Sequence, residues 1–134
     1  MVLDLATDTT VTDCVAVELP VEPQSAAGAR ALISSLQPDS DDSSPDDVRL
    51  LVSELIADGV AAEARSAEPV ITVEAQALDG ATRVMVAFEG LALRLAPDKP
   101  EPAESGWGVY LVRTLANRWG IQRANGSTYV WFQA

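Results

Sequence analysis

The hydrophobic positions between Ser44 and Ser66 follow a helical period, and the rest of the chain is organised around them. Five apolar or small positions recur at spacings of three and four and form one stripe that must be buried: Val48, Leu51, Val52, Leu55 and Gly59. Ser44 suits the N-cap and Pro45 the first helical position, and two aspartates follow in the first turn, near the positive end of the helix dipole. The pattern predicts a long helix that begins at Ser44.

Shorter patterns predict the remaining elements. Alternating apolar residues on both sides of Asp79-Gly80 indicate an antiparallel hairpin, and Asn125-Gly126 indicates a second hairpin with a two-residue turn. Helical spacing recurs before the long helix and again after Gly106-Trp107-Gly108. The expected elements are a strand at 14–19, a helix at 24–36, strands at 70–77 and 82–88, a helix from 107 up to Gly120, and a closing hairpin.

The connections are polar. Residues 1–13 have little periodicity and are expected to form a loose arm or a short edge strand, and residues 37–43 are expected to form an acidic connector. Leu91 to Ser105 contains three prolines among charges and predicts a flexible loop. Two helices and a short third one are too few to cover both sides of a mostly antiparallel sheet. We therefore expect one α+β domain over 14–134, a two-layer sandwich with a mostly antiparallel mixed sheet and the helices on one face.

Composition excludes several kinds of chemistry. Nine Lys and Arg against twenty Asp and Glu give a net charge of −11, which disfavours direct nucleic-acid binding. The chain has no histidine, so histidine-dependent nucleophiles and imidazole metal sites are ruled out. Cys14 is the only cysteine and is expected to be a small buried hydrophobe. Interface anchors are one interpretation of Trp107, Trp119 and Trp131, and closing the core is the favoured one. The acidic N-terminus and the lack of a membrane-length apolar run predict a soluble, cytoplasmic protein.

Carboxylate chemistry remains available on the long helix. Glu54 and Asp58 are four residues apart and therefore stack on one face, away from the apolar stripe. Such a pair can serve acid-base or magnesium chemistry, or it can be a solvated face of an acidic protein. Both interpretations stay open at this point.

Three stretches together carry a family resemblance. LLVSELIADGV resembles LLVSELVTNAV, GWGVYLVRTLANRWG resembles GxGLxLVxxLAxRWG, and GSTYVWFQ resembles a terminal strand, all of the anti-sigma factor serine kinases. These kinases belong to the GHKL group of ATP-binding domains, with gyrase B, Hsp90, histidine kinases and MutL. The resemblance covers nearly the whole chain from Cys14 and implies the Bergerat-type fold, with the segment from Leu91 to Ser105 as a lid over ATP.

The resemblance also assigns roles to single residues. Glu54 matches the general base, and Asp58 matches the asparagine that holds magnesium beside the phosphates. Phe88 stands where the DxGxG box has the aspartate that accepts a hydrogen bond from adenine, and phenylalanine cannot accept one. Gly90, Gly106 and Gly108 are retained, while Ala92 replaces the second glycine of the box. Nucleotide binding is therefore expected to be weak or absent.

Three functions follow from this comparison. The favoured one is a regulatory module that binds a protein partner, a sigma factor or an anti-anti-sigma protein, without a cofactor and with no membrane association. The second is an active protein-serine kinase that uses Mg-ATP, with Glu54 as base and Asp58 on the metal. The third is the same fold adapted to another small ligand beside Phe88. Whether the chain forms a homodimer stays open.

Overall fold

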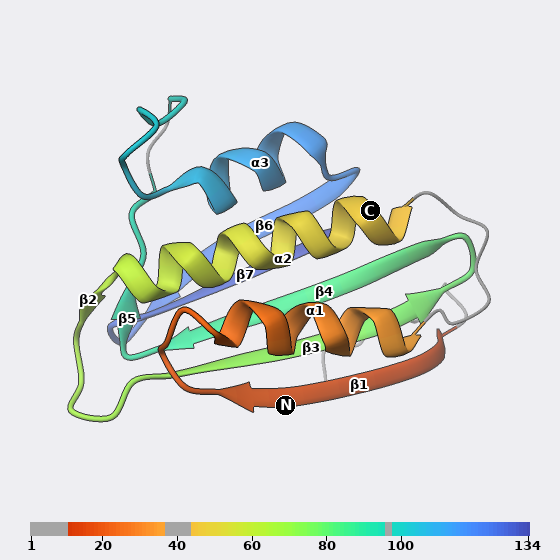
Figure 1. The fold of residues 1–134 in the computed structure, drawn as a ribbon, viewed down its shortest axis with the longest axis horizontal. Helices are drawn as coiled ribbons and strands as arrows, with labels where there is room; N and C mark the ends of the chain where they lie inside the picture. The colour runs from red at the N-terminus through yellow and green to blue at the C-terminus, as the bar shows by residue number, and fades with distance from the viewer. Residues whose placement is uncertain (1–10, 37–43, 96–97) are drawn as a thin grey trace.

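The structure is a computed structural model that describes residues 11–36, 44–95 and 98–134 (Figure 1). Its helices are α1 (Ser25–Leu36), α2 (Ser44–Ala61) and α3 (Trp107–Leu115). The predicted start at Ser44 is confirmed. The predicted extension of the last helix to Gly120 was wrong, because Ala116 has an extended backbone and Asn117 N–H donates to Gln133 O at 2.9 Å, which begins strand pairing.

Five strands form the main sheet, and every neighbouring pair is antiparallel, so the mixed sheet of the prediction was wrong. A short pair, β2 (Glu63–Ala64) and β5 (Leu91–Ala92), stands apart from it. In spatial order the main sheet contains β1 (Val11–Leu19), β3 (Val70–Leu78), β4 (Ala81–Glu89), β7 (Ser127–Gln133) and β6 (Arg118–Ala124).

Both predicted hairpins are confirmed. β3 and β4 meet at Asp79-Gly80, and β6 and β7 meet at Asn125-Gly126. The second turn has φ of 54° at Asn125 and 78° at Gly126. Asparagine and glycine tolerate this left-handed backbone, which two-residue turns between twisted strands require.

The three helices lie on one face of the sheet, with α2 between α1 and α3 (Figure 1). This arrangement confirms an α+β protein of two layers. The predicted stripe of α2 is buried completely at its four aliphatic positions, and it packs with the helix-facing side chains of the strands. The central members of that strand layer are Val73, Val86 and Val130, which stand in register.

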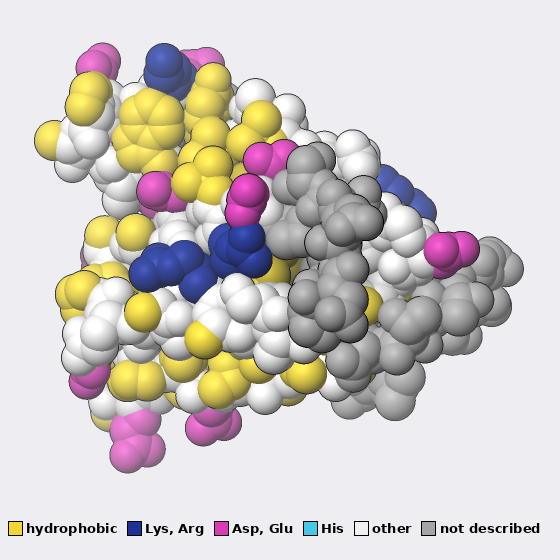
Figure 2. All heavy atoms as spheres, turned by 45° about the vertical axis from the view of Figure 1, so that its right-hand side comes forward, with side chains coloured by type: hydrophobic (Ala, Val, Ile, Leu, Met, Phe, Trp, Pro, Cys, Tyr) yellow, Lys and Arg dark blue, Asp and Glu magenta, His cyan; other side chains and the backbone are white. Residues whose placement is uncertain are grey.

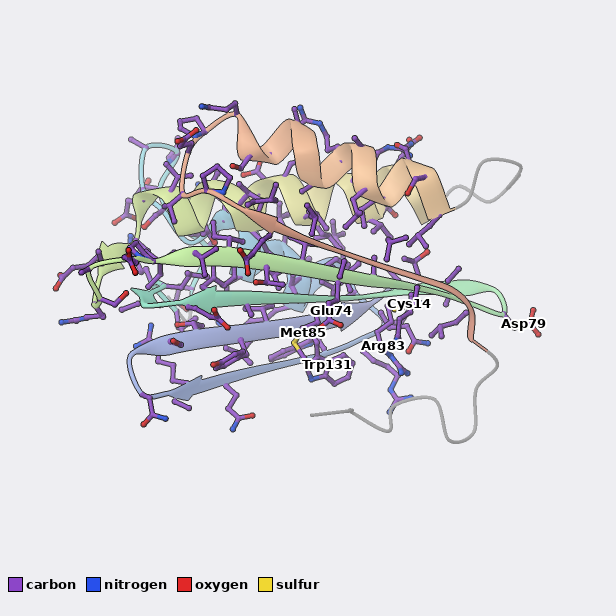
Figure 3. All side chains as sticks on the ribbon, turned by 90° about the horizontal axis from the view of Figure 1, so that it is seen from below. Cys14, Glu74, Asp79, Arg83, Met85 and Trp131 are labelled. Atoms are coloured by element: carbon purple, nitrogen blue, oxygen red, sulfur yellow. The ribbon has the colours of Figure 1, made fainter. Side chains whose placement is uncertain are left out.

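The opposite sheet face carries Cys14, Glu74, Arg83, Met85 and Trp131, which Figure 3 labels together with Asp79 in the β3–β4 turn. Cys14 is exposed on this face, so its predicted burial was wrong: strand side chains alternate, and neighbouring Val15 takes the helix side. A Cβ atom at Gly120 would lie 2.2 Å from Trp131 Nε1, so the indole extends across that glycine.

Trp119 is 42% exposed at the edge strand, where Arg113 lies over its ring, and it does not close the core as predicted.

Two expectations concern segments at the margins of the described chain. Val11–Asp13 belong to the edge strand β1, which agrees with the second of the two alternatives for this segment, and residues 1–10 lie outside the described residues. The predicted connector at 37–43 also lies outside them. None of the described helices is long and apolar enough to cross a membrane.

Candidate functional site

The carboxylate of Asp58 is bonded to the start of α3. Asp58 is only 4% exposed, and its two oxygens accept hydrogen bonds from Gly106 N–H at 2.9 Å and Val109 N–H at 3.1 Å. The first amides of a helix have no partner within the helix and form a natural site for an anion. Here the anion is a side chain of the protein itself.

Two glycines make this contact geometrically feasible. Gly106 has φ of 106°, a left-handed backbone that other residues adopt only with strain. At Gly108 a Cβ atom would lie 2.5 Å from the backbone nitrogen of Leu55, so α3 approaches α2 backbone to backbone. Gly106 and Gly108 therefore have a structural role, which is to bring the α3 amides onto Asp58.

Burial and hydrogen bonding act in opposite directions on Asp58. Desolvation by burial is the larger effect and raises the pKa of this carboxyl above its usual 3.8, while hydrogen bonds from the Gly106, Val109 and Gly108 amides lower it. The nearby charge of Glu54 raises it further. The amides therefore offset only part of the desolvation of the ionised carboxylate.

Phe88 fills the space between β4 and α2. Its side chain is fully buried on the helix-facing side of the sheet, in register with Ile71 and Thr128. A Cβ atom at Gly59 would lie 2.7 Å and 2.9 Å from two carbons of the Phe88 ring. Only a residue without a side chain leaves room for the ring at this point of α2, so Gly59 and Phe88 form a matched pair.

The chain after Gly90 folds inward. Leu91 and Leu93 are 1% and 0% exposed, although the sequence predicted few packing residues in this loop. The hydroxyl of Thr128 donates to Leu91 O at 3.2 Å and accepts from Leu93 N–H at 3.4 Å, and Gly90 N–H donates to Ser127 Oγ at 2.9 Å. The first part of the predicted lid is thus part of the core. The predicted flexible loop was therefore wrong for Leu91 and Leu93, because these leucines pack beneath β7.

The later part of the same loop is tied to α3. Trp107 Nε1 donates to Glu101 O at 3.1 Å, and Arg94 pairs with Glu104 at 2.9 Å. Hydrophobic side chains gather over α3 and this loop at the top of Figure 2. A hollow of about 470 Å³ opens there, lined by Glu54, Pro102, Trp107 and Leu111.

Glu54 and Asp58 therefore both face α3. They do not line a cleft between α2 and the end of β4, because the Phe88 ring occupies that region and Asp58 is bonded to the α3 amides. Glu54 is half-buried at the hollow.

The described residues fit a magnesium nucleotide poorly. The resemblance implies phosphates at the α3 amides and a metal at Asp58, but these groups are bonded to each other. In the part of the chain that the structure describes, no three Asp, Glu, Cys or His side chains form a cluster able to hold a metal ion. The Phe88 ring fills the volume where the family resemblance implies adenine.

Sequence reasoning missed two participants, Gly59 and Thr128. The simultaneous presence of Gly59 and Phe88 was a usable signal, since a large residue on β4 facing a glycine on α2 suggests that the two are matched. No sequence signal pointed to Thr128, whose hydroxyl acts on backbone groups 35 and 37 residues away. Neither a protein-family model nor a curated protein matches this chain.

Proposed function

We propose that the chain is a degenerate relative of the anti-sigma factor serine kinases, with the Bergerat-type GHKL fold, that acts by binding a protein in a partner-switching circuit of the cytoplasm. It uses no nucleotide. The observation that carries this proposal is the Asp58 carboxylate on the amides of α3. The family resemblance assigns those amides to the phosphates, and an internal carboxylate there both competes with phosphate and repels it.

Two further contacts support the loss of nucleotide binding. The Phe88 ring packs at Gly59, where the resemblance implies adenine, and the segment Leu91–Leu93 is buried beneath β7 instead of remaining free to cover a ligand. A polar adenine edge without its hydrogen-bond partner loses about 1 to 3 kcal/mol, about ten- to a hundredfold in affinity. Steric exclusion by the ring adds to that loss.

The surface of α3 supports a protein partner. Leu115 is 44% exposed, Trp107 and Leu111 line the neighbouring hollow, and Tyr110 meets Trp107 edge to face with ring centroids 5.7 Å apart. Aromatic and aliphatic side chains in an exposed cluster are typical of interface anchors. A sigma factor or an anti-anti-sigma protein is the partner class that the resemblance implies.

The alternatives have less support. A kinase would still have Glu54 as its base. The hydrogen bonds between Asp58 and the α3 amides would first have to break, so that the amides could bind phosphate and Asp58 a metal. A new small ligand beside Phe88 would need a cavity there, and the ring is fully buried.

Immobilised wild-type protein, exposed to native cell extract with and without Mg-ATP, tests the proposal. We expect it to retain a sigma factor or its antagonist equally under both conditions. Leu115→Asp should reduce retention, and Leu50→Asp on α2 is the matched control, since Leu50 is 43% exposed.

The opposite results are equally specific. Retention that requires Mg-ATP, or transfer of the γ-phosphate of ATP to a serine of the retained protein, would favour the kinase. Retention of neither protein class would remove the partner-switching proposal.

A further inference from the structure

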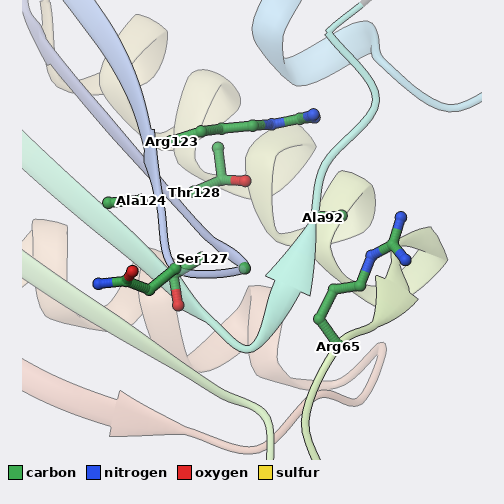
Figure 4. A pocket seen from close by; sticks show the side chains of 8 residues that line it. Arg65, Ala92, Arg123, Ala124, Ser127 and Thr128 are labelled. Carbon is green, nitrogen blue, oxygen red and sulfur yellow. The ribbon is translucent and has the colours of Figure 1, made fainter.

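A second hollow, of about 260 Å³, lies where the β6–β7 turn meets the short strand β5 (Figure 4). Figure 4 shows the side chains of Arg65 and Arg123 on either side of Ala92. The described residues that line it are Arg65, Ala92, Arg123, Ala124, Asn125, Gly126, Ser127 and Thr128.

The charge of this lining is opposite to that of the protein. The chain has twenty acidic and nine basic residues, yet two arginines and no acidic residue are among the described lining residues. Two guanidinium groups in one concave site raise the local concentration of an anion, although the net charge of −11 opposes highly charged polyanions. The site is therefore suited to a small oxyanion.

Arg65 is fixed in place by its backbone and its stem. Its N–H donates to Gly90 O at 2.6 Å, and a Cβ atom at Gly126 would lie 3.4 Å from Arg65 Cβ. Its guanidinium pairs with Glu63 at 3.1 Å, but the side chains in this pair are 53% and 72% exposed. Such a surface pair is weak, and an incoming anion can replace Glu63.

Arg123 is a charged residue on the helix-facing side of the sheet. Strand register places it beside Thr128, which in turn stands beside Phe88. One of its terminal nitrogens donates to Leu93 O, which orients the guanidinium. No carboxylate of the described residues forms an ion pair with Arg123. Since a guanidinium carries five N–H donors, several stay available on a side chain that is already oriented.

We propose that Arg65 and Arg123 bind a phosphate group, either inorganic phosphate or a phosphate monoester, with Glu63 as the internal competitor. The planar forks of two arginines match the tetrahedral oxygens of phosphate and bind them with charge-assisted hydrogen bonds. The site does not involve Asp58, so it is independent of the proposed loss of the nucleotide site.

Titration of ¹⁵N-labelled full-length protein with inorganic phosphate at constant ionic strength tests this assignment, with glycerol phosphate as the monoester arm and acetate as the arm for a planar oxyanion. We expect saturable shifts of the Gly126, Ser127 and Arg123 amides with phosphate, and weaker ones with acetate. Tighter binding of glycerol phosphate than of inorganic phosphate identifies a monoester as the ligand, and the reverse order identifies the free ion.

Three variants make the test specific. Arg65→Gln should weaken phosphate binding about tenfold, because it removes charge-assisted bonds from a side chain that the fold does not need. Glu63→Gln should tighten it by up to about fivefold, since the competitor is removed. Arg118→Gln, on the same strand as Arg123 but outside the hollow, is the control and should leave binding unchanged.

Unsaturable shifts in the wild-type protein would overturn the proposal. So would equal weakening by Arg65→Gln and Arg118→Gln, which would indicate a general charge effect. A Glu63→Gln variant that binds phosphate no more tightly than the wild type would contradict the competitor role.

Discussion

Because Gly59 and Phe88 are in close contact, we expect substitutions at these two positions to have coupled effects on the free energy of unfolding. Gly59→Ala would place a Cβ atom 2.7 Å and 2.9 Å from the ring carbons and 3.0 Å from Ile71 Cδ1. The ring is fully buried and has no room to withdraw. Alanine in place of glycine within a helix is normally stabilising by about 1 kcal/mol, whereas overpacking destabilises by about 1 to 3 kcal/mol. We expect a net loss of up to about 2 kcal/mol.

A double-mutant cycle isolates the clash from the helix effect. Phe88→Leu alone should lower the free energy of unfolding by about 1 to 2 kcal/mol, because a smaller side chain leaves a void. In Gly59→Ala/Phe88→Leu the added methyl group occupies that void and the helix gain is realised. The double variant should be at least as stable as Phe88→Leu, which corresponds to a coupling of about 2 kcal/mol.

Urea unfolding followed by circular dichroism measures all four proteins. Gly28→Ala in α1 is the matched control: its Cβ atom would meet only the tip of Leu19, Cδ2 at 3.2 Å, so the change should be neutral or stabilising by up to about 1 kcal/mol. Strict additivity of the two changes at 59 and 88, or a stabilised Gly59→Ala single variant, would refute the matched-pair interpretation.

Two further predictions concern the contact of α2 with α3. Burial raises the pKa of the Asp58 carboxyl above its usual 3.8, so folding favours the protonated form. This group therefore contributes stability that is fully present below pH 3.8 and is lost as the pH rises through the pKa of the folded protein. Asp58→Asn should lack this loss. The difference between variant and wild type in the free energy of unfolding, measured with urea, should therefore change with pH across the acidic range, and parallel pH profiles would contradict this role of Asp58. Gly108→Ala, whose Cβ would lie 2.5 Å from Leu55 N, should lower the melting temperature by roughly 5 to 15 °C, as about 2 to 3 kcal/mol of overpacking implies, and an unchanged melting temperature would rule out the close approach.

Local patterns predicted most elements of this fold. The start of α2 follows from Ser44 and the acidic first turn, and the β6–β7 hairpin follows from Asn125-Gly126, because both signals act within a few residues. Strand pairing across long separations was not readable in this way. Val11 pairs with Leu78, and that contact, not the composition near Val11, extends β1 into the predicted arm.

The candidate site was predictable in its residues but not in its contacts. Glu54, Asp58 and Phe88 were singled out by residue type and spacing, yet their partners depend on tertiary packing. Whether Asp58 would meet solvent, a metal or the α3 amides was decided by the close approach of two helices at Gly108. The burial of Leu91 depends in the same way on contacts beneath β7, which no local pattern shows.

Calorimetric titration of the wild-type protein with Mg-ATP tests the central proposal, that the protein's own residues occupy the place where the resemblance implies a nucleotide. Adenosine in a parallel titration excludes binding through phosphate alone. We predict that adenosine gives no saturable heat and that ADP does not displace ATP from that place. Low-micromolar binding of Mg-ATP that ADP and adenosine both displace would contradict this proposal and favour the kinase.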